Sequence, residues 1–172
     1  EVVCLDGVTQ GAACTVLTAI SHINNENELI IANSDQFIDL DINNFIQEAR
    51  AGDKDGFIMT FESSHPKWSF ARTGAAGKVL ETAEKRVISN NATVGIYYFR
   101  RGSDFVSGAQ ATIFKNIRHN NEFYVCPVYN ELILDDKKIY IYPISQDKMH
   151  GLGTPEDLGL FLQKLKTEEI RV

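Results

Sequence analysis

The feature that most limits what this chain can fold into is a short apolar run, Leu29-Ile30-Ile31-Ala32, which ends directly in Asn33-Ser34-Asp35-Gln36. Four apolar residues in a row, without a polar residue between them, are typical of a strand that is covered on both faces. Such strands belong to the sheets of α/β proteins, which bind ligands at the carboxyl ends of parallel strands. The run therefore predicts an α/β fold and places Asp35 at the ligand-binding end of its sheet.

The segments around this run extend the pattern. The apolar residues 2–5 precede a helical stretch that begins near Ala12, and together with residues 29–32 they predict a β-α-β unit. Further strands are expected at residues 56–61, 68–72, 78–82, 94–99 and 138–142. Helices are expected after Ser103 as N-cap, over residues 127–134, and after Thr154, where Pro155 takes the first helical position. No linker or repeat divides the chain, so we expect residues 1–172 to form a single domain with a mixed, mostly parallel sheet.

Charge and cysteine content argue against several classes of partner and site. The chain carries 17 Lys and Arg against 23 Asp and Glu, whereas binding along nucleic acid depends on clustered Lys and Arg. Its cysteines, Cys4, Cys14 and Cys126, form no C-x-x-C motif for zinc or redox chemistry, and free thiols fit a reducing cytosol. No apolar run approaches the ~20 residues of a membrane span, and no signal segment is recognisable. We expect a cytoplasmic protein without nucleic-acid or membrane partners.

Three short motifs are candidates for chemistry, and each also has a structural interpretation. Asp35 suits a hard cation such as Mg²⁺, which binds few carboxylates and keeps positions for phosphate and water, although Asn, Ser and Asp are common in turns. Glu84-Lys85 combines an acceptor for sugar hydroxyls with a cation for phosphate, although adjacent charges usually lie on a solvated surface. The backbone amides of Gly11 and Ala12 offer donors at a helix start, or Gly11 serves the turn alone.

Taken in order, these motifs resemble the sugar-1-phosphate nucleotidyltransferases, or nucleoside-diphosphate-sugar pyrophosphorylases. Thr9-Gln10-Gly11-Ala12-Ala13 resembles the turn that contacts the nucleobase in this family, and Asn33-Ser34-Asp35-Gln36 resembles the strand end with the first metal-binding aspartate. Glu84-Lys85 and Val94-Gly95-Ile96-Tyr97 resemble the residues that line the sugar-1-phosphate pocket. Gly153-Thr154-Pro155-Glu156-Asp157 resembles the closing Gly-Thr-Pro helix start. The resemblance runs along nearly the whole chain and rests mainly on the shared order of its motifs.

The resemblance implies a GT-A-like Rossmann fold and a specific reaction. A nucleoside monophosphate would pass from a nucleoside triphosphate to a sugar 1-phosphate or similar phosphorylated acceptor, with release of pyrophosphate. The implied roles are Mg²⁺ binding and catalysis for Asp35, catalysis for Lys85, sugar-phosphate binding for Glu84, Lys85 and Gly95, and nucleobase contacts for Gln10, Gly11 and Ala12. Because the acceptor phosphate is already ionised at neutral pH, the protein mainly positions two anions and offsets their charge.

Two departures from the family change what we expect of this chain. The family opens with a strand and a G-G-x-G-x-R loop that holds the triphosphate, and residues 1–172 contain no such motif. We therefore expect the chain to lack the first strands, to supply the metal- and sugar-binding portion, and to be inactive alone. Relatives often carry a second metal-binding aspartate just before x-Gly-Thr, where this chain has Gly151. His150 beside it is a poor ligand for Mg²⁺, so the second protein ligand is left open.

Rival functions and the state of assembly are also left open. A GT-A glycosyltransferase usually presents a D-x-D pair, which Asp35-Gln36-Phe37 does not supply. A non-catalytic nucleotide- or sugar-binding module is the rival from another class, and the nucleobase, the sugar and a homo-oligomer stay undetermined. In the family, the first strand lies beside the strand that corresponds to residues 29–32. Residues 1–172 alone are thus expected to expose a strand edge that promotes dimers or aggregates, and a stable monomer of 19.3 kDa would contradict this.

Overall fold

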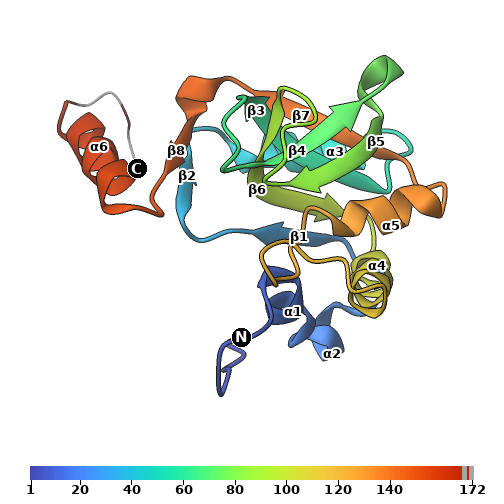
Figure 1. Ribbon diagram of the computed structural model, residues 1–172. Coiled ribbons are helices and arrows are strands. Elements are labelled where there is room, and N and C mark those ends of the chain that lie inside the picture. Colours follow the sequence, from blue (N-terminus) through green and yellow to red (C-terminus); the bar gives the residue numbers. More distant parts are fainter. Residues whose placement is uncertain (168–169, 171–172) are drawn as a thin grey trace.

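The centre of the molecule is a mixed sheet around one long strand, β6 (Asn91–Phe99), as a computed structural model describes it for residues 1–167 and 170. β3 (Gly56–Glu62) pairs antiparallel with one edge of β6, and β7 (Ile139–Ile144) continues from β3 in parallel. The other edge of β6 pairs antiparallel with β1 (Leu29–Ala32) and, near its start, with β4 (Ser69–Thr73). β5 (Val79–Glu84) completes the sheet beside β4, after a hairpin that contains η1 (Ala75–Gly77) (Figure 1).

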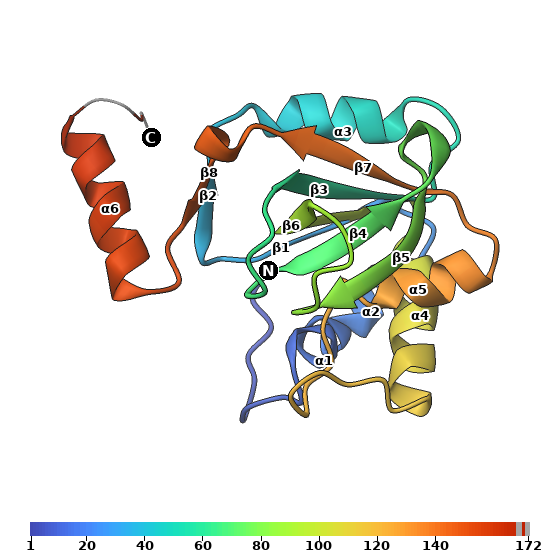
Figure 2. The ribbon, with the colours of Figure 1, turned by 45° about the horizontal axis from the view of Figure 1, so that its top comes forward.

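Helices cover both faces of this sheet. α4 (Gly102–Phe114), α5 (Val128–Leu134) and the short helices α1 (Ala12–Leu17) and α2 (Ile20–Ile23) lie on one face, and α3 (Ile42–Arg50) lies on the other (Figure 2). Side chains alternate along β6, so Tyr97 and Phe99 enter the core under α4 and α5, whereas Tyr98 enters the core with Phe45 of α3. Burial on both faces is why residues 94–99 read as an almost unbroken apolar run.

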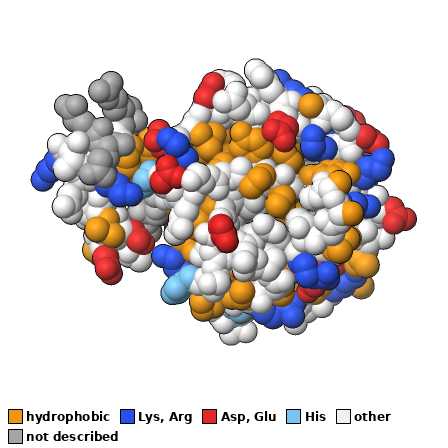
Figure 3. Space-filling view, turned by 90° about the horizontal axis from the view of Figure 1, so that it is seen from above, with side chains coloured by type: hydrophobic (Ala, Val, Ile, Leu, Met, Phe, Trp, Pro, Cys, Tyr) orange, Lys and Arg blue, Asp and Glu red, His pale blue; other side chains and the backbone are white. Residues whose placement is uncertain are grey.

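A smaller unit is attached to one side of this layered body. β2 (Gln36–Ile38) and β8 (Met149–Gly151) form a two-stranded antiparallel sheet, with η2 (Gln146–Lys148) just before β8. The chain then enters α6 (Pro155–Lys166), which projects from the body as a separate lobe (Figure 3). The helix starts at Thr154 as predicted, because the backbone N–H of Asp157 donates to Thr154 Oγ1 at 3.1 Å.

The α/β fold is confirmed, and so are the predicted strands from residue 56 onward and the two C-terminal helices. The share of parallel pairing is smaller than predicted: of the strand pairs in the described residues, β3–β7 is parallel and the others are antiparallel. The apolar runs that suggested parallel strands indicate only that a strand is buried on both faces of the sheet. An antiparallel strand such as β6 is buried in the same way.

Two local predictions were wrong. Residues 2–5 form no strand, since nothing in the described part of the chain pairs with them and Val2 is 86% exposed, so the predicted β-α-β unit is absent. Ser103 is not the N-cap of α4: Arg101 takes that position, and the helix begins at Gly102, whose backbone N–H donates to Asn27 O at 2.8 Å. The Ser103 hydroxyl donates instead to Glu26 Oε1, at 3.1 Å.

β1 has an open edge within the described residues. It pairs with β6, and its outer side meets no other described strand. Ile30 in this strand is 39% exposed, so the coverage that the apolar run suggested is incomplete here. Self-association through this edge stays a prediction. In the part of the chain that the structure describes, no helix is long and apolar enough to cross a membrane.

Candidate active site

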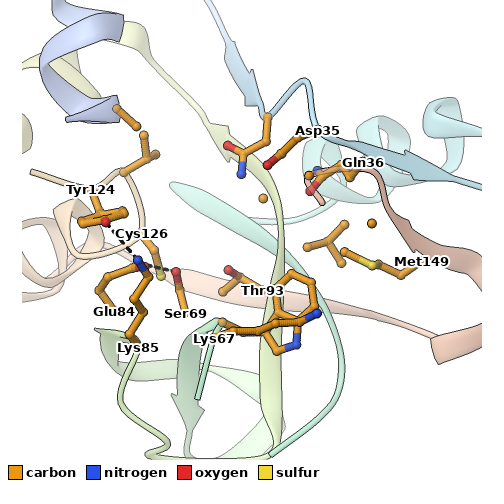
Figure 4. A pocket seen from close by; sticks show the side chains of 18 of the residues that line it. Asp35, Gln36, Lys67, Ser69, Glu84, Lys85, Thr93, Tyr124, Cys126 and Met149 are labelled. Atoms are coloured by element: carbon orange, nitrogen blue, oxygen red, sulfur yellow. Dashed lines mark hydrogen bonds between the residues drawn. The ribbon is translucent and has the colours of Figure 1, made fainter. Parts of the chain in front are cut away.

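A cavity of about 380 Å³ opens where several strands of the sheet end (Figure 4). Asn33 and Asp35 reach it from the segment after β1, Gly95 from the middle of β6, and Glu84 and Lys85 from the end of β5. Residues that are far apart in the sequence therefore share one cavity. The structure brings together the residues predicted for the metal and for the sugar phosphate.

Gly95 lines this cavity at a place where neighbouring side chains approach the backbone closely. Its φ of +88° is a conformation that favours glycine, and an added Cβ would lie 2.6 Å from Asn33 Nδ2 and 2.9 Å from Gln36 Oε1. The backbone N–H of Asn33 also donates to Gly95 O at 2.9 Å. The Asn33-Ser34-Asp35-Gln36 segment can thus pack closely against β6 because position 95 has no side chain.

Glu84 and Lys85 form one wall of the cavity with fixed partners. The Ser69 hydroxyl donates to the Glu84 carboxylate, and burial raises the pKa of this carboxyl group. Lys85 has a left-handed backbone conformation, with φ of +50°, and its Nζ donates to Tyr124 Oη at 3.1 Å. That hydrogen bond raises the pKa of Lys85, which keeps the ammonium charged at neutral pH. The pair is therefore half-buried and held in place, and the interpretation as a freely solvated surface pair does not apply.

The opposite wall is acidic and comes from the residue before β2 and from the start of α6. Asp35 and Asp157 both line the cavity, and the backbone N–H of Leu152 donates to Asp35 O at 2.7 Å. An added Cβ on Gly153 would lie 3.0 Å from Asp35 Oδ2. On Gly151 it would lie 3.5 Å from Asp157 Oδ2, so this carboxylate borders the space that a larger side chain at position 151 would fill. Local sequence pattern did not single out Asp157 as more than a helix-start residue.

The predicted base-binding turn lies at a third side of the cavity. Ala12 lines the cavity, whereas Gln10 and Gly11 do not. Gly11 has a φ of +116°, and an added Cβ would lie 2.5 Å from Phe123 O, so the turn needs glycine for its packing as well as its conformation. Gln10 Oε1 accepts a hydrogen bond from Arg118 Nη2 at 2.7 Å.

Three residues that the sequence did not single out also line the cavity: Lys67, Trp68 and Tyr124. The Lys67 ammonium lies 4.6 Å from the centre of the Trp68 ring, and no carboxylate pairs with it among the described residues. The signal in the sequence was weak, because an isolated Lys-Trp pair before a strand has no distinctive spacing. The contribution of Lys67 and Trp68 to the cavity depends on the conformation of the turn after β3, which the sequence pattern could not predict.

Two other reactive side chains are not candidates for this chemistry. Cys126 lines the cavity, but burial raises the pKa of its thiol far above neutral pH, so it is not a thiolate nucleophile. His150 does not line the cavity; it is buried and stacks on Phe37, with ring centres 6.1 Å apart. No group of three or more His, Cys, Asp or Glu side chains suited to a metal occurs in the described residues.

Residues 2–146, well over half of the chain, match the family described as nucleotidyl transferase. The chain belongs to this family. Its fold is similar to a nucleoside-diphosphate-sugar pyrophosphorylase from Vibrio cholerae RC9, with 27% identity and a TM-score of 0.76 over 92% of this chain and 67% of that one. It is also similar to a Bacillus anthracis protein assigned as a glucose-1-phosphate thymidylyltransferase and crystallised with a sucrose. The identity there is 16% and the TM-score 0.67, over 87% of this chain and 58% of that one.

At that level of identity the second likeness shows the fold alone. A comparison with curated protein sequences finds no match. The resemblance to sugar-1-phosphate nucleotidyltransferases, first drawn from the order of the motifs, is confirmed. This chain spans about two thirds of the first of these two structures and less of the second. The substrates of this protein and the roles of its residues are therefore proposals.

Proposed function

We propose that the protein transfers a nucleoside monophosphate from a nucleoside triphosphate to a sugar 1-phosphate or similar phosphorylated acceptor and releases pyrophosphate. The observation that carries the proposal is that a half-buried Glu84–Lys85 wall faces an acidic Asp35 wall across one cavity, in a member of the nucleotidyl transferase family. In this proposal residues 1–172 supply the sugar and metal side of the reaction. The cytosol suits it, because the three cysteines are unpaired thiols.

The chemistry needs no nucleophile from the protein. An oxygen of the acceptor phosphate, already ionised at neutral pH, attacks the α-phosphorus of the triphosphate. The bond between the α-phosphorus and the bridging oxygen breaks, and that oxygen leaves with the electron pair as part of pyrophosphate. The protein's task is to bring two anions together and to offset their charge. Lys85 would offset charge on the acceptor phosphate, and Glu84 would accept hydrogen bonds from sugar hydroxyls and orient the ring.

The acidic wall fits Mg²⁺ as the group that would share this work. Asp35 and Asp157 are oxygen donors on the same wall, and Mg²⁺ is typically held by one or two carboxylates together with water and substrate phosphates. We propose Asp35 as the principal ligand and Asp157 as the second carboxylate, in place of the residue absent at Gly151. When bound, the ion would withdraw charge from the phosphate oxygens at the reacting centre. His150 is excluded as a direct ligand in this arrangement because its ring is buried against Phe37.

The turn at residues 10–12 would form the nucleobase side of the site. Ala12 reaches the cavity directly, and Gly11 allows a close approach of a flat ring to the backbone. We assign Gln10 to the same turn, although its amide oxygen is occupied by Arg118. A non-catalytic binding module is the second candidate function, because residues 1–172 contain no G-G-x-G-x-R motif.

The decisive experiment measures pyrophosphate release by the full-length gene product with CTP, UTP, GTP and dTTP, each combined with several sugar 1-phosphates. We expect release with one preferred nucleotide, dependent on both the acceptor and Mg²⁺. Residues 1–172 assayed alone are expected to give none. Nucleotide binding without release in any combination would favour the binding module, and transfer of a sugar from a nucleotide sugar would favour the glycosyltransferase.

A further inference from the structure

The segment between α4 and α5 touches the site at two places although most of it lies outside the cavity. The backbone N–H of Phe123 donates to Gln10 O at 2.8 Å, and the N–H of Ala13 donates to Phe123 O at 3.0 Å. These two bonds tie residues 10–13 to Phe123 along the backbone, with Gly11 packed between them. One residue later, Tyr124 accepts the hydrogen bond of Lys85. The segment therefore links the nucleobase turn to the sugar-phosphate wall.

Arg118 is the side chain that secures this link. Its Nε donates to Asn116 Oδ1 at 2.6 Å, its Nη1 to Asn121 O at 2.9 Å, and its Nη2 to Gln10 Oε1 at 2.7 Å. Its guanidinium carbon lies 4.0 Å from the centre of the Phe123 ring, which adds a cation–π contact. The planar fork of arginine suits three such directions at once, whereas the ammonium of a lysine would not reach them in the same geometry.

The partners of Arg118 distinguish it from an ordinary surface arginine. All three acceptors are neutral, and no carboxylate forms an ion pair with Arg118 among the described residues. Arg86 is the useful contrast. Arg86 and Arg118 both line a second cavity of about 460 Å³, but Arg86 forms an ion pair with Glu81 at 2.8 Å. Ordering a long side chain costs conformational entropy, which several hydrogen bonds to neutral groups must offset. The side chain of Arg118 thus joins its own loop, through Asn116 and Asn121, to the 10–13 turn, through Gln10.

We propose that Arg118 is a positioning residue for nucleotide binding, acting through Gln10 on the turn that carries Ala12 into the cavity wall. This inference rests on the proposed function, in which that turn faces the nucleobase. The alternative is that Arg118 merely stabilises its own loop, in which Asn116, Asn120 and Asn121 have left-handed backbone conformations. A loop-stabilising role would lower thermal stability and disturb both substrates, because the same segment carries Tyr124 beside Lys85.

The test compares Arg118→Ala, Arg118→Lys and the control Arg86→Ala in the full-length gene product. For both Arg118 variants we expect the KM for the triphosphate to rise about tenfold, the effect of losing one hydrogen bond to a charged group. The KM for the acceptor and kcat should stay within about twofold of wild type. Tm should fall by no more than about 2 °C, and Arg86→Ala should match wild type. Equal rises in both KM values, an unchanged KM for the triphosphate, or wild-type behaviour of Arg118→Lys would overturn the proposal.

A double-mutant cycle tests the route through Gln10. If Arg118 acts through that side chain, Arg118→Ala in a Gln10→Ala background should raise the KM for the triphosphate by a factor of less than about two. Independent, multiplying effects would overturn the route. Titration of each variant with the preferred triphosphate separates this inference from the proposed reaction. Wild-type binding that Arg118→Ala weakens, without pyrophosphate release, would support the inference and refute the reaction, whereas no binding by the wild type would overturn both.

Discussion

The two walls of the cavity are built in different ways. Glu84 and Lys85 stand at the end of a strand of the central sheet, where Ser69 and Tyr124 hold their side chains. Asp35 and Asp157 belong to the β2–β8 unit and the start of α6, which project from the body of the molecule. The first wall is fixed by the main core, and the second depends on a few contacts of its own. A substitution in one wall should therefore have consequences of a different kind from a substitution in the other.

The largest effect is expected on the acidic wall, from Asp35→Asn. This change keeps the shape of the side chain and removes its charge, so the fold should persist while the proposed metal loses its principal ligand. We expect kcat to fall by about 10²-fold or more, the loss typical of removing a key electrostatic group. Mg²⁺ titration of the variant should show weaker binding, which gives a readout besides turnover. Asp39→Asn, on the same unit and outside the cavity, is the matched control. Turnover within about threefold of wild type would refute the role of Asp35.

The second test concerns the anchor of that wall, Phe161. Its ring lies 5.2 Å from Phe37 and 5.8 Å from His150, and it is the buried residue of α6. Phe161→Ala removes about 2 kcal/mol of apolar burial, which corresponds to about a 30-fold loss of hydrogen-exchange protection in α6. Amides of β3 and β6 should keep their protection, because their core does not include Phe161.

Phe105→Ala, in the main core, gives the opposite pattern and serves as the comparison. Phe105 is fully buried and packs against Phe99, so its loss should lower the protection of the whole sheet. If Phe161→Ala instead unfolds the sheet together with α6, the two walls share one cooperative unit and the contrast between them is wrong.

This contrast also explains what the sequence could predict. Strands such as β6 and the helix start at Thr154 were recognisable because local pattern and tertiary burial agree there. Strand direction was not, since coverage on both faces produces the same apolar run in either direction. Residues 2–5 show the limit of composition: an apolar run becomes a strand where a neighbour pairs with it, and the described structure offers none.

The candidate site divides in the same way. Asp35, Glu84, Lys85 and Gly95 were found because a known family carries similar motifs in the same order, and the structure places them in one cavity. Lys67, Tyr124 and Asp157 were not found, because their part in the cavity depends on how loops pack. Gly151 was noted as a departure from the family at the position of the second metal-binding aspartate, and its effect on metal binding stays a prediction. That Asp157 borders the resulting space follows from the turn between β8 and α6, which no local pattern encodes.

A smaller and more selective effect is expected on the sugar wall, from Glu84→Ala. The proposed role of Glu84 is to accept hydrogen bonds from the acceptor's hydroxyl groups, so the KM for the acceptor should rise about tenfold. The KM for the triphosphate should change by less than about twofold. Glu81→Ala on the same strand is the control, because its carboxylate pairs with Arg72 and Arg86 and does not line the cavity. Unchanged kcat and unchanged acceptor KM in Glu84→Ala would return Glu84 to a purely structural role.

The smallest effect sharpens the comparison through pH. His150 is buried against the rings of Phe37 and Phe161, which also contact each other, and its Nε2 has no hydrogen-bond partner among the described residues. Burial lowers the pKa of His150, Lys164 and Lys148 act in the same direction, and Asp39 and Asp147 oppose them. When α6 separates from His150, the imidazole becomes exposed and binds a proton more readily than when α6 is docked against it. Docking of α6 is unaffected above the ordinary His pKa of about 6.5 and weakens below it.

Hydrogen exchange of α6, corrected for intrinsic rates, should thus lose a few-fold of its protection between about pH 7 and pH 5. Amides of β5 on the sugar wall should not follow this change, because they belong to the main sheet. His150→Phe should flatten the pH dependence while it keeps the aromatic packing, and His22→Gln, at an exposed site, should leave the dependence intact. Protection that rises as pH falls, or that changes equally in both walls, would show that the acidic wall is not held independently of the sheet.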